Sequence, residues 1–155
     1  MSFTIIAATN PEEMAEARAL FLEYAAESKL DLCFQNFEAE LAGLPGRYAP
    51  PNGRLLLARA ESDFAGCSAI RKLEEGVCEM KRMFVRPAFR RRGVGKLLAL
   101  ELIQETRRIG YSKMRLDTLS SMRPALDLYE SLGFCRIPPY YDNPLPQVVY
   151  LELTL

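Results

Sequence analysis

The sequence contains no histidine among its 155 residues. Ser-His-Asp and Cys-His catalysis need an imidazole base, and most transition-metal sites use histidine ligands. The absence therefore excludes these nucleophilic mechanisms and makes a metal site improbable. Four cysteines, Cys33, Cys67, Cys78 and Cys135, are scattered without a CxxC pair. We expect free, mostly buried thiols in a reducing cytosol, not a disulfide framework or a zinc site.

The chain also lacks an excess of charge of either sign and any long apolar run. Twenty Lys and Arg residues balance twenty Asp and Glu residues, whereas nucleic-acid binding usually needs a strong basic excess. The longest apolar runs, such as 55–58, are far shorter than the roughly 20 residues of a membrane helix. Residues 1–6 carry no basic patch and predict a strand, not a signal peptide. We expect a cytoplasmic protein without a nucleic-acid or membrane partner.

What is present is the composition of one globular domain. Apolar residues make up 49% and charged residues 26% of the chain, and no repeat or linker divides it, so residues 1–155 are predicted to form a single domain. The expected order is βααβββαβαββ, an α/β sandwich around one sheet. Strands are expected at 3–8, 54–60, 64–73, 77–85, 113–118, 134–137 and 148–153, and helices at 11–27, 36–41, 94–109 and 124–132.

Two of these elements carry a pattern that predicts their buried faces. In the helix at 94–109 the apolar stripe is expected to consist of Val94, Leu97, Leu98, Leu102 and Ile109. In the strand at 77–85, simple alternation puts Glu79 on the same face as Val77, Lys81, Met83 and Val85.

A basic loop and a glycine turn join the strand at 77–85 to the helix at 94–109. A helix N-terminus presents unpaired N–H groups and a positive dipole end, and glycines let a diphosphate approach them. Leu98 stands where a Rossmann fingerprint needs its third glycine, and Leu97 stands where a Walker A loop needs Ser or Thr. The spacing that fits is [Arg/Gln]-x-x-Gly-x-[Gly/Ala]. A solvated basic turn and a nucleic-acid patch are the alternatives, and the balanced net charge disfavours the second.

Two motifs in this order resemble those of the Gcn5-related N-acetyltransferase (GNAT) family. The segment Arg90-Arg91-Arg92-Gly93-Val94-Gly95, after Met83-Phe84-Val85-Arg86-Pro87, resembles the family's pyrophosphate loop. Residues 125–134 (ALDLYESLGF) resemble its AxxLYxxxGF segment. The resemblance covers about 77–134. It implies a mixed, mostly antiparallel sheet with splayed parallel central strands and helices on both faces.

The resemblance also implies an activity. Acetyl-CoA would be the cosubstrate, without a metal, and a primary amine of a small molecule or peptide would attack it directly in a ternary complex. A non-catalytic acyl-CoA sensor is the alternative. A homodimer through the last strands is compatible with the resemblance.

Site residues follow from the resemblance position by position. Coenzyme A would lie in a V-shaped gap between the strands at 77–85 and 113–118. The Arg90 side chain is expected to matter most, and core packing is the alternative role for Met83 and Val85. Backbone groups are expected to bind the pantetheine at Met83, Phe84 and Val85, and the pyrophosphate at Arg91, Arg92, Gly93, Val94, Gly95 and Lys96.

Two side chains are candidates for proton transfer. Tyr129 would donate a proton to the departing thiolate, with packing against the sheet as the alternative. Glu79, in the middle of a strand, would accept the amine's proton through water. Its alternative role is a salt bridge with Lys81 or a cross-strand arginine.

One position departs from the family motif, and the expected acceptor site carries no motif. Met122 stands where the family often has an asparagine, and Thr118, Ser120 or Ser121 is the candidate replacement. An aromatic wall with Asp142 suits a small cationic amine, although the loop at 137–144 can equally cap a sheet edge. The expected acceptor side comprises Tyr24, Phe34, Gln35, Phe37, Tyr48, Tyr140, Tyr141, Asp142 and Asn143.

Overall fold

The computed structural model describes residues 2–28 and 36–155. Cys33, Phe34 and Gln35 lie outside the described residues. The predicted order of helices and strands is confirmed, with two additional short 3-10 turns at Gly46–Tyr48 and Pro87–Phe89. The elements are β1 (Thr4–Ala7), α1 (Pro11–Ser28), α2 (Phe37–Ala42), β2 (Arg54–Ala60), β3 (Asp63–Glu74), β4 (Val77–Val85), α3 (Val94–Ile109), β5 (Lys113–Leu119), α4 (Arg123–Ser131), β6 (Cys135–Ile137) and β7 (Val148–Thr154).

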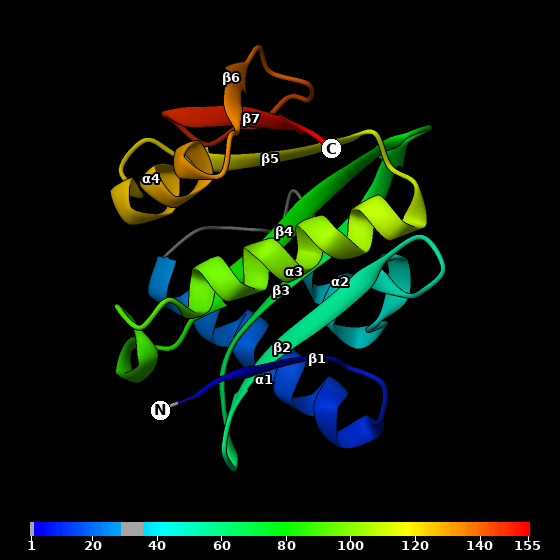
Figure 1. The fold of residues 1–155 in the computed structure, drawn as a ribbon, viewed down its shortest axis with the longest axis vertical. Helices are drawn as coiled ribbons and strands as arrows, with labels where there is room; N and C mark the ends of the chain where they lie inside the picture. The colour runs from blue at the N-terminus through cyan, green and yellow to red at the C-terminus, as the bar shows by residue number, and fades with distance from the viewer. Residues whose placement is uncertain (1, 29–35) are drawn as a thin grey trace.

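The described strands form one seven-stranded sheet in the order β1-β2-β3-β4-β5-β7-β6. Every neighbouring pair is antiparallel except β4 and β5, which run parallel. Figure 1 shows α3 crossing one face of the sheet, with α1 and α2 behind it. The α/β fold class with a mostly antiparallel sheet, expected from the sequence, is confirmed.

The parallel pair β4 and β5 separates soon after it forms. Pairing covers three residues of each strand and ends at Glu79 opposite Arg115. Beyond that point β4 stays paired with β3 up to Val85, and β5 stays paired with β7 up to Leu119. The sheet therefore opens along one seam while both halves keep their outer partners, as the expected V-shaped gap requires.

Two apolar clusters hold the helices on the sheet. One lies between the sheet and α3 and α4 and includes Met80, Leu98, Leu102, Met114 and Leu126. We call it the α3 cluster. The other, the α1 cluster, lies on the opposite face and includes Leu20, Phe21, Leu57, Cys67 and Phe84. Fully burying one such Leu or Phe side chain contributes about 1.5–3 kcal/mol, so these clusters fix both helix layers.

Helix α3 begins and ends at glycines in left-handed conformation, Gly93 at φ 80° and Gly110 at φ 108°. Val94, Leu98 and Leu102 are buried as predicted. The assignment of Leu97 to the buried stripe was wrong, because its side chain is 40% exposed. At 100° per residue Leu97 lies outside the arc of the buried residues. The buried face is completed by Ala99, Ile103 and Thr106.

Strand β4 carries a β-bulge at Arg82. Arg82 has a φ of 60°, and β4 places two residues where β3 places one, because Lys81 pairs with Ala69 and Phe84 pairs with Cys67. A bulge shifts the alternation of side chains by one position. The buried Arg82 guanidinium binds Glu40 of α2 through two bonds of 2.8 and 2.9 Å.

The bulge overturns the predicted face of Glu79. Met83 and Val85 pack against the α3 cluster, as Met80 does, although simple alternation would separate them from Met80. Glu79 alternates with Met80 and so lies on the other face. It therefore shares a face with Lys81 but not with Met83 or Val85.

Of the described cysteines, Cys67 and Cys78 are buried and Cys135 is exposed. Within residues 2–28 and 36–155, no helix is long and apolar enough to cross a bilayer.

The two adjacent leucines of α3 give a matched test of this packing. Leu98→Ala is expected to lower the free energy of unfolding by about 2–5 kcal/mol, because Leu98 is fully buried and its loss leaves a cavity. Leu97→Ala is expected to change it by less than about 0.5 kcal/mol, because that side chain is at the surface. Urea unfolding measures both, and equal losses would contradict the assigned faces.

Candidate functional site

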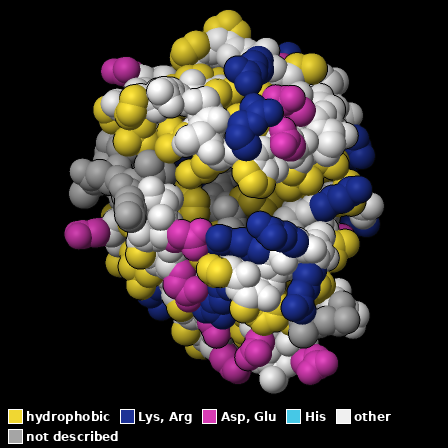
Figure 2. Space-filling model, turned by 90° about the vertical axis from the view of Figure 1, so that its left-hand side faces the viewer, with side chains coloured by type: hydrophobic (Ala, Val, Ile, Leu, Met, Phe, Trp, Pro, Cys, Tyr) yellow, Lys and Arg dark blue, Asp and Glu magenta, His cyan; other side chains and the backbone are white. Residues whose placement is uncertain are grey.

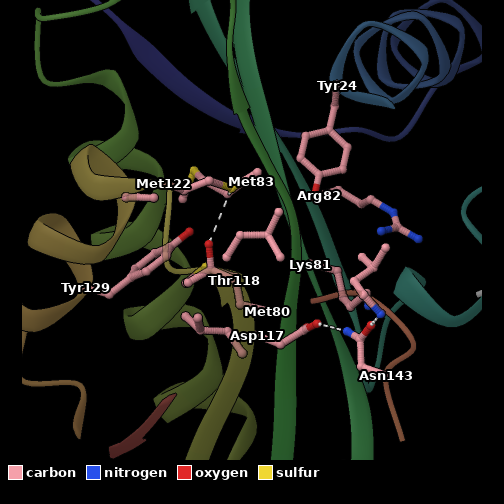
Figure 3. A pocket seen from close by; sticks show the side chains of 14 residues that line it. Tyr24, Met80, Lys81, Arg82, Met83, Asp117, Thr118, Met122, Tyr129 and Asn143 are labelled. Carbon is pink, nitrogen blue, oxygen red and sulfur yellow. Dashed lines mark hydrogen bonds between the residues drawn. The ribbon is translucent and has the colours of Figure 1, made fainter. Parts of the chain in front are cut away.

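A cavity of about 100 Å³ lies where β4 and β5 separate (Figure 3). Both strands contribute four consecutive residues to it, and α1, α4 and the loop before β7 close it. It is lined by Tyr24, Met80, Lys81, Arg82, Met83, Leu116, Asp117, Thr118, Leu119, Met122, Ala125, Tyr129, Asn143 and Leu145.

The cavity has two chemically different sides, because it passes through the open seam of the sheet. Met80, Leu116 and Tyr129 belong to the α3 cluster and make one side apolar. Lys81 and Asp117 come from alternate positions of the same strands and so lie on the α1 side. Figure 3 shows Met122 and Tyr129 on one side and Tyr24, Arg82 and Asn143 on the other.

The glycine turn at the start of α3 lies beside β4 and α4, two elements that contribute residues to this cavity. A Cβ placed on Gly95 would lie 3.6 Å from Leu128 and 3.9 Å from Val85, so the turn sits between α4 and the end of β4. Arg91 and Gly93 both have positive φ, which turns the backbone sharply into the helix. No side chain caps α3, and the first bond within the helix runs from Leu97 N–H to the Gly93 carbonyl.

The N–H groups of the first turn of α3 therefore point outward, available to an anion. Figure 2 shows the side of the molecule on which α3 begins, where Lys and Arg side chains lie beside a hollow lined by apolar side chains. The positions expected to bind pyrophosphate are thus together at one helix N-terminus.

Arg90 has local partners that the sequence did not reveal. Its Nε donates to the Val85 carbonyl at 2.9 Å, and its guanidinium pairs with Glu27 of α1. The same group lies 5.7 Å from the centre of the Phe84 ring. Arg90 thus joins the end of β4 to the end of α1 beside the glycine turn.

Tyr129 both packs and lines the cavity. Its ring meets Phe134 at 5.6 Å, and only 5% of the residue is exposed. Burial raises the pKa of the Tyr129 phenol above its usual value of 10. The hydroxyl consequently remains protonated near neutral pH, as a proton donor must.

Glu79 lies at the last paired position before the strands separate and is almost completely buried, with 1% exposure. Its Oε1 accepts a hydrogen bond of 3.0 Å from Nε of Arg71 in β3 and lies 2.9 Å from Nη2 of the same guanidinium in a salt bridge. Its Oε2 accepts a bond of 2.7 Å from the Tyr140 hydroxyl. The cross-strand arginine considered from the sequence is therefore its ionic partner, and Glu79 is not among the residues that line the cavity.

Asp117 is a cavity residue that the sequence analysis missed. Its Oδ2 accepts bonds from the Tyr141 hydroxyl at 2.6 Å and from the Asn143 amide at 3.0 Å. Its Oδ1 accepts no hydrogen bond from any described residue. The available signal was a charged residue in the middle of a predicted strand, as at Glu79.

Lys81, which the sequence suggested only as a salt-bridge partner of Glu79, also lines the cavity. It is 6% exposed, and burial lowers the pKa of its ammonium, which Glu79 and Asp117 partly offset. Within the described parts of the chain, Lys81 forms no salt bridge.

The expected acceptor residues divide into lining, supporting and distant groups. Tyr24 and Asn143 line the cavity. Tyr140 and Tyr141 pack against each other and against Tyr150 with ring centres 5.3–5.8 Å apart. Phe37 lies under Arg82, Tyr48 lines a second cavity beside Glu40 and Arg71, and Asp142 is exposed.

Met122 lines the cavity where the family often has asparagine, and its sulfur accepts a bond of 3.5 Å from the Thr118 hydroxyl. Of the proposed replacements, Thr118 also lines the cavity, whereas the Ser120 hydroxyl donates to Gln147. Thr118 is therefore the polar side chain best placed beside Met122.

Comparisons with known proteins agree with the two sequence motifs. The model of the Acetyltransferase (GNAT) family matches residues 14–134. The chain is 44% identical to a Schizosaccharomyces pombe protein named Uncharacterized N-acetyltransferase C1271.07c, over 99% of this chain and 96% of that protein.

Solved structures share the fold. An acetyltransferase from Streptococcus agalactiae has a TM-score of 0.82 at 19% identity, covering 99% of this chain and 98% of that one. The PaiA N-acetyltransferase from Thermoplasma acidophilum, in complex with coenzyme A, has a TM-score of 0.74 at 16% identity and covers 100% of both chains.

Proposed function

The chain belongs to the GNAT acetyltransferase family, and on this premise we propose that it transfers an acetyl group from acetyl-CoA to a primary amine of a small molecule or peptide. The observation that carries the proposal is the open seam between β4 and β5, which ends beside an α3 N-terminus without a side-chain cap. The seam can accommodate an extended ligand, and the free N–H groups at the start of α3 can bind its phosphates.

The backbone supports binding of coenzyme A at this seam. From Met80 onward the edge of β4 that faces β5 has no strand partner, so alternate residues among Met83, Phe84 and Val85 can offer N–H and C=O groups to the pantetheine amides. The N–H groups at the start of α3 would hold the pyrophosphate, with positive charge from Arg91, Arg92 and Lys96.

Gly95 fits a close phosphate contact. A Cβ added at this position would meet its neighbours at 3.6 and 3.9 Å, which are ordinary contacts, so the fold itself does not require glycine there. A ligand that approaches the backbone closely would require it.

The polar side of the cavity is suited to the amine. We place the ammonium at Asp117 Oδ1, since Oδ2 already accepts two bonds. An ammonium loses one proton to Asp117 before nitrogen attacks the thioester carbonyl. The C–N bond forms and the C–S bond breaks. The second nitrogen proton and the proton held by Asp117 are then released to solvent.

We assign to Tyr129 the protonation of the thiolate that leaves. Acetyl-CoA supplies the activated acetyl group as a thioester, and its transfer expels a thiolate of coenzyme A. The Tyr129 phenol lies on the apolar side, where α4 meets the seam. Solvent then restores its proton. Glu79 remains the alternative base, and Asp117 is preferred because it lines the cavity.

The proposed function is tested by titrating the purified protein with acetyl-CoA and measuring thiol release over a panel of amines. Binding with amine-dependent release supports the enzyme. Binding without release from any amine supports the sensor alternative. No binding would reject both.

Gly95→Ala separates phosphate binding from folding. Alanine suits the helix and is expected to raise the free energy of unfolding by up to about 1 kcal/mol. The added methyl obstructs the phosphate, so calorimetry should show acetyl-CoA affinity falling by about tenfold, equivalent to ~1.4 kcal/mol. Leu97→Ala is the control on the same helix. Unchanged affinity in a stabilised Gly95→Ala protein would remove the phosphate site from the turn.

Asp117→Asn, Glu79→Gln and Tyr129→Phe assign the proton transfers. Asp117→Asn is expected to lower kcat by about 10²–10⁴-fold, because the amide cannot accept the proton. Tyr129→Phe should lower kcat with little change in acetyl-CoA affinity. Glu79→Gln should act mainly on stability, since it breaks the pair with Arg71. A large kcat loss in a stable Glu79→Gln protein, with Asp117→Asn active, would make Glu79 the base.

A further inference from the structure

Among the described charged residues around the cavity, Lys81 and Asp117 form no salt bridge, whereas the others are paired. Arg82 is bound to Glu40 by two hydrogen bonds, and Arg71 is bound to Glu79. Lys81 has no salt bridge or hydrogen bond to a described residue, although it is 6% exposed and lines the cavity. Asp117 has neutral donors on Oδ2 and, in the described structure, no hydrogen bond on Oδ1.

A nearly buried ammonium without a partner is unfavourable and is usually retained where it meets an anion. Of the described carboxylates, Glu79 and Glu40 form ion pairs with Arg71 and Arg82, and Asp117 attracts the Lys81 ammonium without forming a salt bridge with it. A ligand that brings a carboxylate would complete the pair. Asp117, on the same side of the seam, would at the same time receive a cation.

We propose that the acceptor is a small molecule with both a primary amine and a carboxylate, an amino acid, with Lys81 binding the carboxylate and Asp117 the ammonium. One unpaired cation and one unpaired anion on the same side of the cavity match the two charges of such a zwitterion. This inference rests on the proposed function and names its substrate class.

The geometry separates this acceptor from the acetyl donor. Lys81 lies on the α1 side, while Met80, Leu116 and Tyr129 form the α3 side. Asn143 fixes Asp117 from the loop before β7, with its amide 2.8 Å from the Tyr141 hydroxyl. Asp117 would therefore stay oriented toward the seam as the acceptor enters. Lys81 acts on specificity: it holds the carboxylate and takes no proton in the reaction.

The test compares matched acceptors. The twenty amino acids are assayed with acetyl-CoA by thiol release, and the best one is compared with its carboxamide and with its decarboxylated amine. The amino acid is expected to have at least about tenfold higher kcat/KM than either, the ratio that a charged hydrogen bond supplies. If the carboxamide or the amine is equally good, the inference fails and the acetyltransferase proposal stands. If no acceptor releases thiol, the proposed function itself fails.

Lys81→Met assigns the preference to this side chain. The ratio of kcat/KM for the amino acid over its carboxamide should fall toward one, whereas Lys81→Arg should keep most of it. Lys72→Met makes the same chemical change at an exposed pair with Glu75 and should leave the ratio unchanged. Acetyl-CoA titration of each variant verifies the fold. If a folded Lys81→Met protein keeps the unmodified protein's ratio of kcat/KM for the amino acid over its carboxamide, the assignment is wrong.

Discussion

The structure depends on the early separation of two parallel strands. β4 and β5 pair over three residues and then diverge, and each keeps its antiparallel partner on the outer side. The hydrophobic clusters on both faces tolerate this because α3 and α4 cover one face and α1 the other. Unpaired backbone groups in the interior are costly. The open seam is therefore where a ligand with amide groups gains most, and the family's cosubstrate is such a ligand.

The bulge at Arg82 decides which side chains reach the seam. It moves Met83 and Val85 to the α3 face and leaves Lys81 on the α1 face. It also brings a buried guanidinium to Glu40 and so ties α2 to the middle of the sheet. One positive φ angle thereby separates an apolar side of the cavity, which we propose for the donor, from a charged side, which we propose for the acceptor. In the proposed function both substrates would meet at the seam, which favours direct transfer.

The loop before β7 links the acceptor side to the seam. Tyr140 bonds Glu79 and Tyr141 bonds Asp117, so two hydroxyls of adjacent residues hold carboxylates on the two separating strands. Both strands are thus fixed at the point where their own pairing has ended. The proposed proton acceptor Asp117 and the ion pair Glu79–Arg71 are thus held by the same loop.

The sequence by itself determined the order of elements, the glycine turn at Gly93 and the AxxLYxxxGF segment, because caps, alternation and turn residues act within a few positions of the chain. The helical periodicity wrongly placed Leu97 on the buried face. Which side of a helix is buried depends on the elements that pack against it. Only the tertiary structure decided the face of Glu79, which a bulge relative to β3 controls. Only the tertiary structure showed that Glu79 binds Arg71 and Tyr140, the second of which is 61 residues away in the sequence. Lys81 and Asp117 emerged as the unpaired charges for the same reason: whether a charge is neutralised depends on distant segments, which no local pattern encodes.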